Sequence, residues 1–270
     1  MFVETQNSGI LISKIRNARI FTLARPEALN AIDHPMVTSL NLAMDEAEAD
    51  VTCTAIVLTG QGRSFCAGAD LKAAKQRQEN SQHAGEFDSQ LFVRSVTNLM
   101  SRIEKFPCPV IAAVQGMALA GGLELVLCCD LVLAARSAKF ADAHANYGLL
   151  PGGGASVRLP RKIGSTRAKQ MMFTGEMFAA QTLYEWGLVN QVIEDSELMN
   201  AVSELLEKLS TKSPIGLRQM KRLINNGQTM SADDALEFEQ KVFAEHALTH
   251  DRKEGLSAFS ERRKPVFKGH

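Results

Sequence analysis

The sequence predicts an α/β fold, because short apolar strands alternate with amphipathic helices along the first two thirds of the chain. Residues 53–59 form an apolar, β-branched run that stops at Gly60, a pattern typical of a buried strand. Residues 109–114 and 131–134 repeat the apolar pattern, with helical spacing between them. This alternation favours βαβ units and parallel pairing of the strands.

The remaining elements of this part follow from residue spacing. Residues 10–15 and 19–24 are apolar runs separated by a short polar turn, which predicts an opening hairpin. Residues 76–88 are polar and poorly periodic, so we expect a mobile loop there. Helical periodicity is found in three stretches, which are residues 35–50, 92–105 and 122–129.

After about Asp195 the pattern changes to helices alone. Pro214 suits the first position of a helix, and no strand signal interrupts the region. We therefore expect an α/β core over residues 1–195 and a helical region for packing or assembly over residues 196–270. The successive amphipathic stretches are residues 198–209, 214–225 and 232–248.

Composition and charge exclude several classes of protein. A chain of 270 residues can bury a large core, and its 30 basic and 30 acidic side chains cancel. We expect neither nucleic-acid binding nor attraction to anionic membranes. The five cysteines lack CxxC spacing and lie in apolar runs, so they are interpreted as reduced core residues. Since no membrane span or targeting pattern is visible, the expected location is cytoplasmic.

The first segment that could bind a ligand is the turn Ala67-Gly68-Ala69, which leads from the strand into a helix expected near Asp70. Small residues let a ligand approach the backbone, and free amides there can donate hydrogen bonds to an anion. A plain strand-to-helix connection is an equally good interpretation of this turn alone. The glycines lack GxGxxG spacing, which excludes a Rossmann dinucleotide site.

The second segment has Gly121 and Gly122 at a predicted helix N-terminus, where amides and the helix dipole face outward. Glu124 lies on the first turn of this otherwise apolar helix. Such a carboxylate is either a structural cap or a group kept for proton transfer. Considered together, the two turns can direct two backbone amides at one oxygen, which would make an oxyanion hole.

Further motifs follow in order along the chain. They include Arg25-Pro-Glu-Ala-Leu-Asn-Ala31, Phe65-Cys-Ala-Gly-Ala-Asp-Leu-Lys72, the 116–130 block, 148–154, Arg158-Leu-Pro-Arg161, 179–190 and 259–267. In this order and spacing the chain resembles the crotonase, or enoyl-CoA hydratase/isomerase, superfamily over nearly its whole length. The resemblance implies a spiral of ββα units followed by C-terminal helices that build trimers, commonly stacked into hexamers. It also implies an acyl-CoA substrate, with coenzyme A arriving as part of the substrate and no further cofactor or metal.

The resemblance carries specific roles onto this sequence. The amides of Ala69 and Gly121 would form the oxyanion hole, and Glu124 would be the main acid/base. Arg25 and Ala28 would lie near the nucleotide end of coenzyme A. The residues implied to line the pocket through adenine and pantetheine contacts are Ala67, Ala69, Asp70 and Leu71.

The sequence departs from the family at one catalytic position. Hydratases of this family normally use two glutamates, and His144 occupies the second position, twenty residues after Glu124. Asp142 and Asn146 lie two residues to either side, so neither takes that place without a register shift. Glu124 can hold water and act as a base, and His144 can supply a proton or orient the water. The alternative is that His144 sets specificity or is merely tolerated.

We therefore expect an enoyl-CoA hydratase-like lyase. Decarboxylation is disfavoured, because it would bring a substrate carboxylate beside the like-charged Glu124. Isomerisation is disfavoured as well, because in this family it generally relies on the absent second glutamate. Dehalogenation needs an aspartate where Gly152 stands. Hydrolysis needs only one base and the oxyanion hole, so an acyl-CoA hydrolase stays open. A catalytically silent acyl-CoA binder also stays open.

Weaker candidates lie elsewhere. His246 and His250 are one helical turn apart, but no third ligand accompanies them, so a solvated surface is the favoured interpretation. His83 would approach the acyl group only if the polar loop folded over it. A basic tail is either solvated or directed at the phosphates of coenzyme A, and it comprises Arg262, Arg263, Lys264 and Lys268.

Overall fold

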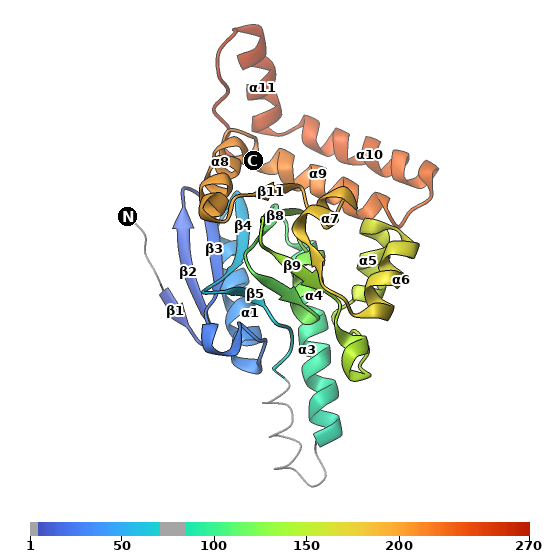
Figure 1. The fold of residues 1–270 in the computed structure, drawn as a ribbon. Helices are drawn as coiled ribbons and strands as arrows, with labels where there is room; N and C mark the ends of the chain where they lie inside the picture. Colours follow the sequence, from blue (N-terminus) through green and yellow to red (C-terminus); the bar gives the residue numbers. More distant parts are fainter. Residues whose placement is uncertain (1–4, 71–84) are drawn as a thin grey trace.

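The computed structural model describes residues 5–70 and 85–270, whose larger sheet has the strand order β1-β2-β3-β4-β6-β8-β11 (Figure 1). β1 to β3 are antiparallel, and every pairing from β3 to β11 is parallel. The opening hairpin and the buried parallel strands are thus confirmed. The strands are β1 (Thr5–Asn7), β2 (Ile10–Ile15), β3 (Ala18–Leu23), β4 (Ala55–Gly60), β6 (Val110–Val114), β8 (Leu131–Ala135) and β11 (Gln191–Ile193).

A second, smaller sheet has the order β10-β9-β7-β5. Its strands are β5 (Ser64–Cys66), β7 (Met117–Leu119), β9 (Lys139–Ala141) and β10 (Phe178–Ala179). β4, β6 and β8 are each followed by a strand of this smaller sheet and then by a helix. The chain therefore repeats a ββα unit, which confirms the expected spiral. The short strands were not predicted, because two or three residues are too few to show a periodicity.

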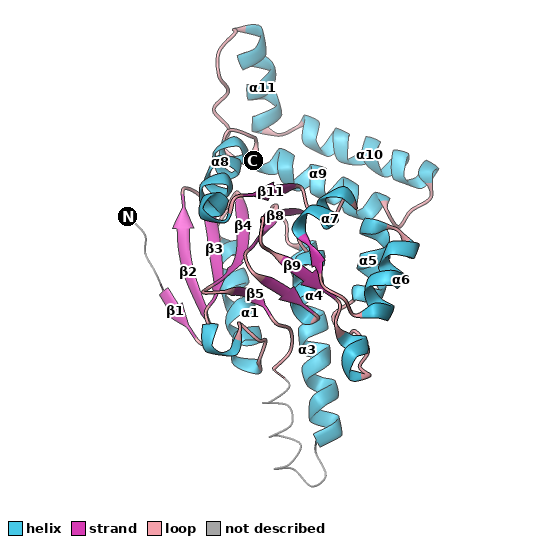
Figure 2. Ribbon diagram, viewed as in Figure 1, coloured by secondary structure: helices cyan, strands magenta, loops and turns pink. Residues whose placement is uncertain are grey.

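Helices cover the sheets (Figure 2). α1 begins after Asp33, whose side chain accepts a hydrogen bond from the amide of Met36. α3 begins at Gly85, so the predicted loop is wrong for residues 85–88, while residues 76–84 lie outside the described part. The first turn of α3 is mostly polar and lacks apolar periodicity, so the sequence pattern did not indicate a helix there. The helices are α1 (His34–Ala49), α3 (Gly85–Lys105), α4 (Gly121–Leu127), α5 (Ala155–Ile163), α6 (Ser165–Thr174) and α7 (Ala180–Glu185).

Three short 3-10 helices complete this part of the chain, namely η1 (Pro26–Ala28), η2 (His144–Tyr147) and η3 (Asp195–Glu197). The C-terminal region is helical, as expected: α8 (Leu198–Ser210), α9 (Pro214–Gly227), α10 (Ala232–Ala247) and α11 (His250–Ser260). α8 belongs to the same hydrophobic core as the sheets through Leu198, Val202 and Leu206. α9 to α11 extend beyond one end of the strands (Figure 1).

All five cysteines are buried and unpaired, as predicted. Within residues 5–70 and 85–270, no helix has the length and apolar character needed to cross a bilayer. The division of the chain at residue 195 stays a prediction. α8 follows that residue in the sequence, yet it packs into the same hydrophobic core as the sheets.

A partly buried ion pair joins α9 to the core, with Lys221 buried and the Asp130 side chain 24% exposed. The ammonium of Lys221 donates to Asp130 Oδ2 at 2.6 Å and to the carbonyl of Cys108 at 3.2 Å. Asp130 also accepts a hydrogen bond from the amide of Val110 at 2.7 Å. Burial raises the pKa of Asp130 although the lysine charge opposes it. The lysine charge therefore offsets part of the cost of burying the carboxylate.

We expect Lys221→Ala to reduce the free energy of unfolding by about 1.5–3 kcal/mol, because it leaves a partly buried carboxylate without its cation. Arg222→Ala is the matched control on the same helix, since Arg222 forms an exposed pair with Glu245. Its loss is expected to stay below about 1 kcal/mol. Urea unfolding at neutral pH measures both, and equal losses would contradict the anchoring role of Lys221.

Candidate active site

The two glycine/alanine turns lie against each other. A Cβ built on Gly121 would lie 3.3 Å from the Cα of Gly68 and 3.4 Å from the amide nitrogen of Ala69. Ile32 donates to the carbonyl of Gly68 at 2.7 Å and accepts from the amide of Asp70 at 2.9 Å. This parallel bridge leaves the N–H of Ala69 on the side away from Ile32.

Gly121 is the first residue of α4, where an amide has no acceptor within the helix. Within the described part of the chain, neither Ala69 nor Gly121 donates its N–H to another residue. Two neighbouring amides are therefore available to one external oxygen. This juxtaposition is the one that the sequence predicted for an oxyanion hole, whereas the helix expected near Asp70 falls outside the described residues.

The backbone around these amides is conformationally demanding. Gly68 has φ +96°, and Ala120 has φ +49°, which costs an L-residue about 1–3 kcal/mol. A Cβ on Gly122 would lie 2.1 Å from the carbonyl oxygen of Cys66. Glycine is thus required where α4 passes β5, and its absence of a side chain lets the two turns approach.

Glu124 projects from α4 and is 3% exposed. Its Oε1 accepts hydrogen bonds from the amide of Gly153 at 2.7 Å and from the amide of Ala155 at 3.0 Å. Ala155 is the first residue of α5, so the carboxylate also lies at the N-terminus of a second helix. Oε2 makes no hydrogen bond to the described residues, which leaves it available for a water molecule.

Burial raises the pKa of Glu124, and the amides of Ala155 and Gly153 and the charge of His144 only partly oppose this effect. A carboxylate with a raised pKa is a stronger base once it has lost its proton. Glu124 therefore combines two properties of a general base, a fixed orientation and a pKa moved towards neutrality.

His144 begins η2 and is 9% exposed. Its Nδ1 lies 3.0 Å from Oδ1 of Asp142, which follows β9 directly. Burial alone lowers the pKa of His144. The hydrogen bond and charge of Asp142, together with the charge of Glu124, outweigh this effect, so the pKa of His144 is raised above its usual value. His144 and Glu124 thus influence each other electrostatically across the same site.

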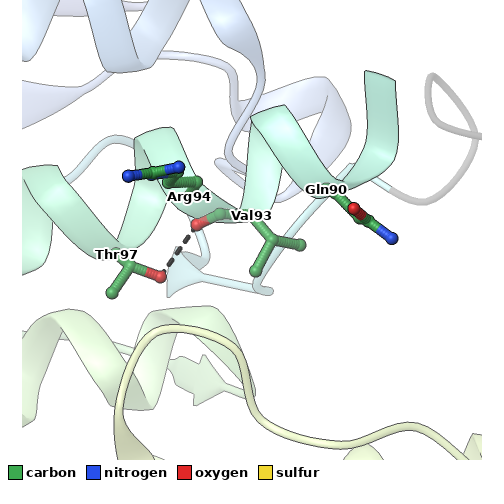
Figure 3. Close-up of a pocket in the computed structure, with 4 residues that line it drawn as sticks. All are labelled: Gln90, Val93, Arg94 and Thr97. Atoms are coloured by element: carbon green, nitrogen blue, oxygen red, sulfur yellow. Dashed lines mark hydrogen bonds between the residues drawn. The ribbon is translucent and has the colours of Figure 1, made fainter. Parts of the chain in front are cut away.

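An open surface pocket of about 410 Å³, here called the α3 cavity, lies along α3 and is lined by Gln90, Val93, Arg94 and Thr97 (Figure 3). The hydroxyl of Thr97 donates to the carbonyl of Gly152 at 2.5 Å. A Cβ on Gly152 would lie 2.7 Å from Val93 Cγ1. The wall of the α3 cavity therefore contacts the segment whose next residue, Gly153, holds Glu124.

The residues implied in coenzyme A binding gather near the first turn. Arg25 forms ion pairs with Asp33 at 3.0 Å and with Asp70 at 2.9 Å. The amide of Ala67 donates to the carbonyl of Leu29 next to Ala28. Leu71 lies outside the described residues. The binding roles of this set stay predictions, and the guanidinium of Arg25 already serves two carboxylates.

His250 and Arg263 make their ion pairs with residues outside this site. His250 Nδ1 lies 3.5 Å from Asp251 Oδ1, and residues 5–70 and 85–270 contain no metal-like cluster of three or more His, Cys, Asp or Glu side chains. In the basic tail, Arg263 pairs with Glu254 and Glu261, and its hydrogen bonds lower the pKa of Glu254 to about 2. His83 lies outside the described residues.

Sequence reasoning missed how the Glu124 carboxylate is supported. Arg158 donates to the carbonyl of Gly153 at 2.6 Å and forms an ion pair with Glu104 at 2.8 Å. The peptide of Gly153 is thereby fixed at both its carbonyl and its amide. The motif Arg158-Leu-Pro-Arg161 was visible in the sequence, but its distance along the chain from Glu124 gave no sign of this contact.

Comparisons with known proteins identify the family of the chain. The family model for enoyl-CoA hydratase/isomerase matches residues 16–270, so the chain belongs to this family and is an enzyme of the crotonase superfamily. It is 35% identical over 258 residues to the short-chain-enoyl-CoA hydratase of Clostridium acetobutylicum, covering 95% of this chain and 96% of the relative.

The chain is also similar to a relative named as an isomerase and to a solved structure of a hydratase. The chain is 37% identical over 250 residues to the 1,2-epoxyphenylacetyl-CoA isomerase of Escherichia coli, covering 92% of this chain and 94% of the relative. A crystal structure of an enoyl-CoA hydratase from Bacillus anthracis matches with a TM-score of 0.91 at 33% identity, covering 97% of this chain and 100% of that chain. The crotonase fold is thereby confirmed.

Gly153→Ala is expected to lower turnover by at least about tenfold, because its Cβ would lie 2.7 Å from Oε2 of Glu124 and 2.2 Å from Sδ of Met100. Met100→Ala removes the second clash only. We therefore expect the double variant to regain thermal stability relative to Gly153→Ala but not turnover. Steady-state kinetics with an enoyl-CoA and thermal unfolding measure the two effects. Full recovery of activity in the double variant would contradict the contact with Glu124.

Proposed function

We propose that the protein is an enoyl-CoA hydratase, which adds water across the α,β double bond of an acyl-CoA thioester. One observation carries the proposal: a buried carboxylate, Glu124, is fixed through a single oxygen by two backbone amides. The neighbouring amides of Ala69 and Gly121 supply the second requirement of this chemistry, which is stabilisation of charge on the thioester oxygen.

In the proposed reaction, the thioester carbonyl oxygen accepts hydrogen bonds from Ala69 and Gly121. Glu124 removes a proton from water as the water oxygen bonds to the β carbon, and the electron pair of the double bond moves towards the thioester oxygen. His144 then gives a proton to the α carbon. Transfer of the proton from Glu124 to His144 restores both groups, so one water is consumed and no charge is left over.

The proposed reaction uses the backbone amides of Ala69 and Gly121, the side chains of Glu124 and His144, one water molecule and the substrate. Hydration is redox-neutral, and both of its protons pass through Glu124 and His144 in the proposed scheme. We therefore propose that coenzyme A enters as part of the substrate and that no additional cofactor takes part. The α3 cavity is proposed to receive the acyl chain, because its wall contacts Gly152.

Thioester hydrolysis is the second candidate, since it needs only the paired amides and one base. The replacement of the second glutamate by His144 is the observation that favours it. A silent acyl-CoA binder would use the same pocket, and the loss of the second glutamate would then mark lost hydration. The two alternatives differ from the hydratase in their products, which makes them separable by one assay.

We expect Glu124→Gln to reduce kcat for hydration of crotonyl-CoA by about 100-fold or more, because the amide cannot accept the water proton. The fall in absorbance of the conjugated thioester measures hydration, and a thiol reagent measures hydrolysis. Release of free thiol by the wild type would identify a hydrolase. Binding with neither signal would identify a silent binder, and unchanged turnover of Glu124→Gln would contradict its role.

We also propose self-association into trimers or pairs of trimers through α9 to α11. These helices bury few apolar side chains, as Val242 in α10 and Ala258 in α11 illustrate. Instead, they and their connections expose a set of large ones, namely Met220, Ile224, Leu236, Phe243, Leu248, Leu256 and Phe259. Exposed apolar patches of this kind mark protein interfaces.

Replacing Ile224 and Phe243 together with aspartate is expected to lower the molar mass in solution to that of one chain. The reason is that two charges would have to enter the proposed interface. Leu42→Asp is the control, because Leu42 is 54% exposed on α1, a helix outside this region. Size-exclusion chromatography with light scattering gives the mass, and an unchanged mass in the double variant would contradict the proposed surface.

A further inference from the structure

Asp142 and His144 form a pair that the local backbone holds in place. The amide of His144 donates to the carbonyl of Asp142 at 2.8 Å, so a tight turn joins the two residues. Ala143 between them has φ +59°, a conformation that L-residues rarely adopt. The side-chain contact of 3.0 Å between Oδ1 and Nδ1 is therefore built on a strained connection.

Asp142 is held there at a cost. It is 1% exposed, and its Oδ2 is buried without a hydrogen bond from any residue of the described part. A buried carboxylate oxygen without a donor destabilises a fold, so such groups call for a functional explanation. The second observation is thus independent of the geometry of the pair, and it points to the same carboxylate.

The contact also determines which nitrogen of His144 can react. When Nδ1–H donates to Asp142, Nε2 is the nitrogen that gains and loses a proton. The charged groups that act on the imidazole are Asp142, from the turn after β9, and Glu124, from α4. Both are acidic, and both stabilise the imidazolium form.

We infer that Asp142 is a positioning residue that orients His144 and keeps its Nε2 protonated for delivery to the α carbon of the substrate. This inference rests on the proposed hydratase function. After Nε2 loses its proton to the α carbon, His144 is neutral and still donates Nδ1–H to Asp142. Glu124 then returns the proton it took from water to Nε2, while Asp142 itself exchanges no proton.

Asp142→Asn tests this role, because asparagine keeps the size of the side chain but removes its charge. We expect kcat for crotonyl-CoA hydration to fall at least about tenfold, with KM changed less than about twofold. The raised pKa of His144 keeps it protonated to higher pH in the wild type. Loss of the Asp142 charge lowers the pKa of His144. As pH rises, the variant should therefore lose activity at a lower pH than the wild type does.

Asn146→Ala is the matched control from the same 3-10 helix, since Asn146 bonds to the carbonyl of Gly175 and not to the imidazole. It should keep the wild-type pH profile. The double variant Asp142→Asn, His144→Gln should be no slower than His144→Gln alone, because Asp142 acts through His144. An unchanged pH profile in Asp142→Asn, or additive losses, would overturn the inference.

A measurement without substrate separates this inference from the proposed function. Nuclear magnetic resonance of ¹⁵N-histidine-labelled wild type, assigned with His144→Gln, should show Nδ1 protonated throughout the titration of His144. Nε2 should be the titrating nitrogen. Proton loss from Nδ1 would overturn the role of Asp142 even if hydration is observed. The expected spectrum in a protein that does not hydrate crotonyl-CoA would retain the pair and reject the proposed function.

Discussion

The hydrogen bonds from the amides of Gly153 and Ala155 to Oε1 of Glu124 are the interaction on which the site depends. They connect the start of α4 to the start of α5 and give a buried carboxylate the donors it needs. The same segment is fixed from the outside by Thr97 of α3 and by Arg158 of α5. The orientation of Glu124 therefore depends on three helices, although only α4 carries the residue.

The paired turns impose a second constraint, which concerns the backbone. Gly68 and Gly122 cannot carry a Cβ without steric conflict or strain, and Ala120 accepts a positive φ at some energetic cost. The ββα spiral makes this close approach possible, because β5 and β7 are neighbours in the small sheet. The positions of the two free amides are thus a consequence of topology and of glycine at a few positions.

These physical features explain what could be predicted from the sequence. Long periodic elements such as α1 and the hairpin of β2 and β3 were found because apolar spacing specifies them. The two glycine/alanine turns that lie against each other were visible as local patterns, because small residues next to predicted helix starts stand out in a sequence. The roles of Glu124, Ala69 and Gly121 came from the family resemblance and stay predictions. The short strands, the start of α3 and the contact of Arg158 with Gly153 were not found, since they depend on packing between distant segments.

The substitution at His144 changes the electrostatics of the site as well as one residue. Two buried carboxylates in one pocket repel each other, so one of them is kept protonated. A carboxylate and an imidazolium attract each other, and the raised pKa of His144 is partly due to the charge of Glu124. In the proposed mechanism, the Glu124 carboxylate and the His144 imidazolium therefore stabilise each other's charged forms. Asp142 adds a second acceptor for the imidazolium, which favours the histidine as the proton donor. Histidine in place of the second family glutamate is therefore compatible with acid/base chemistry at the double bond of an enoyl thioester.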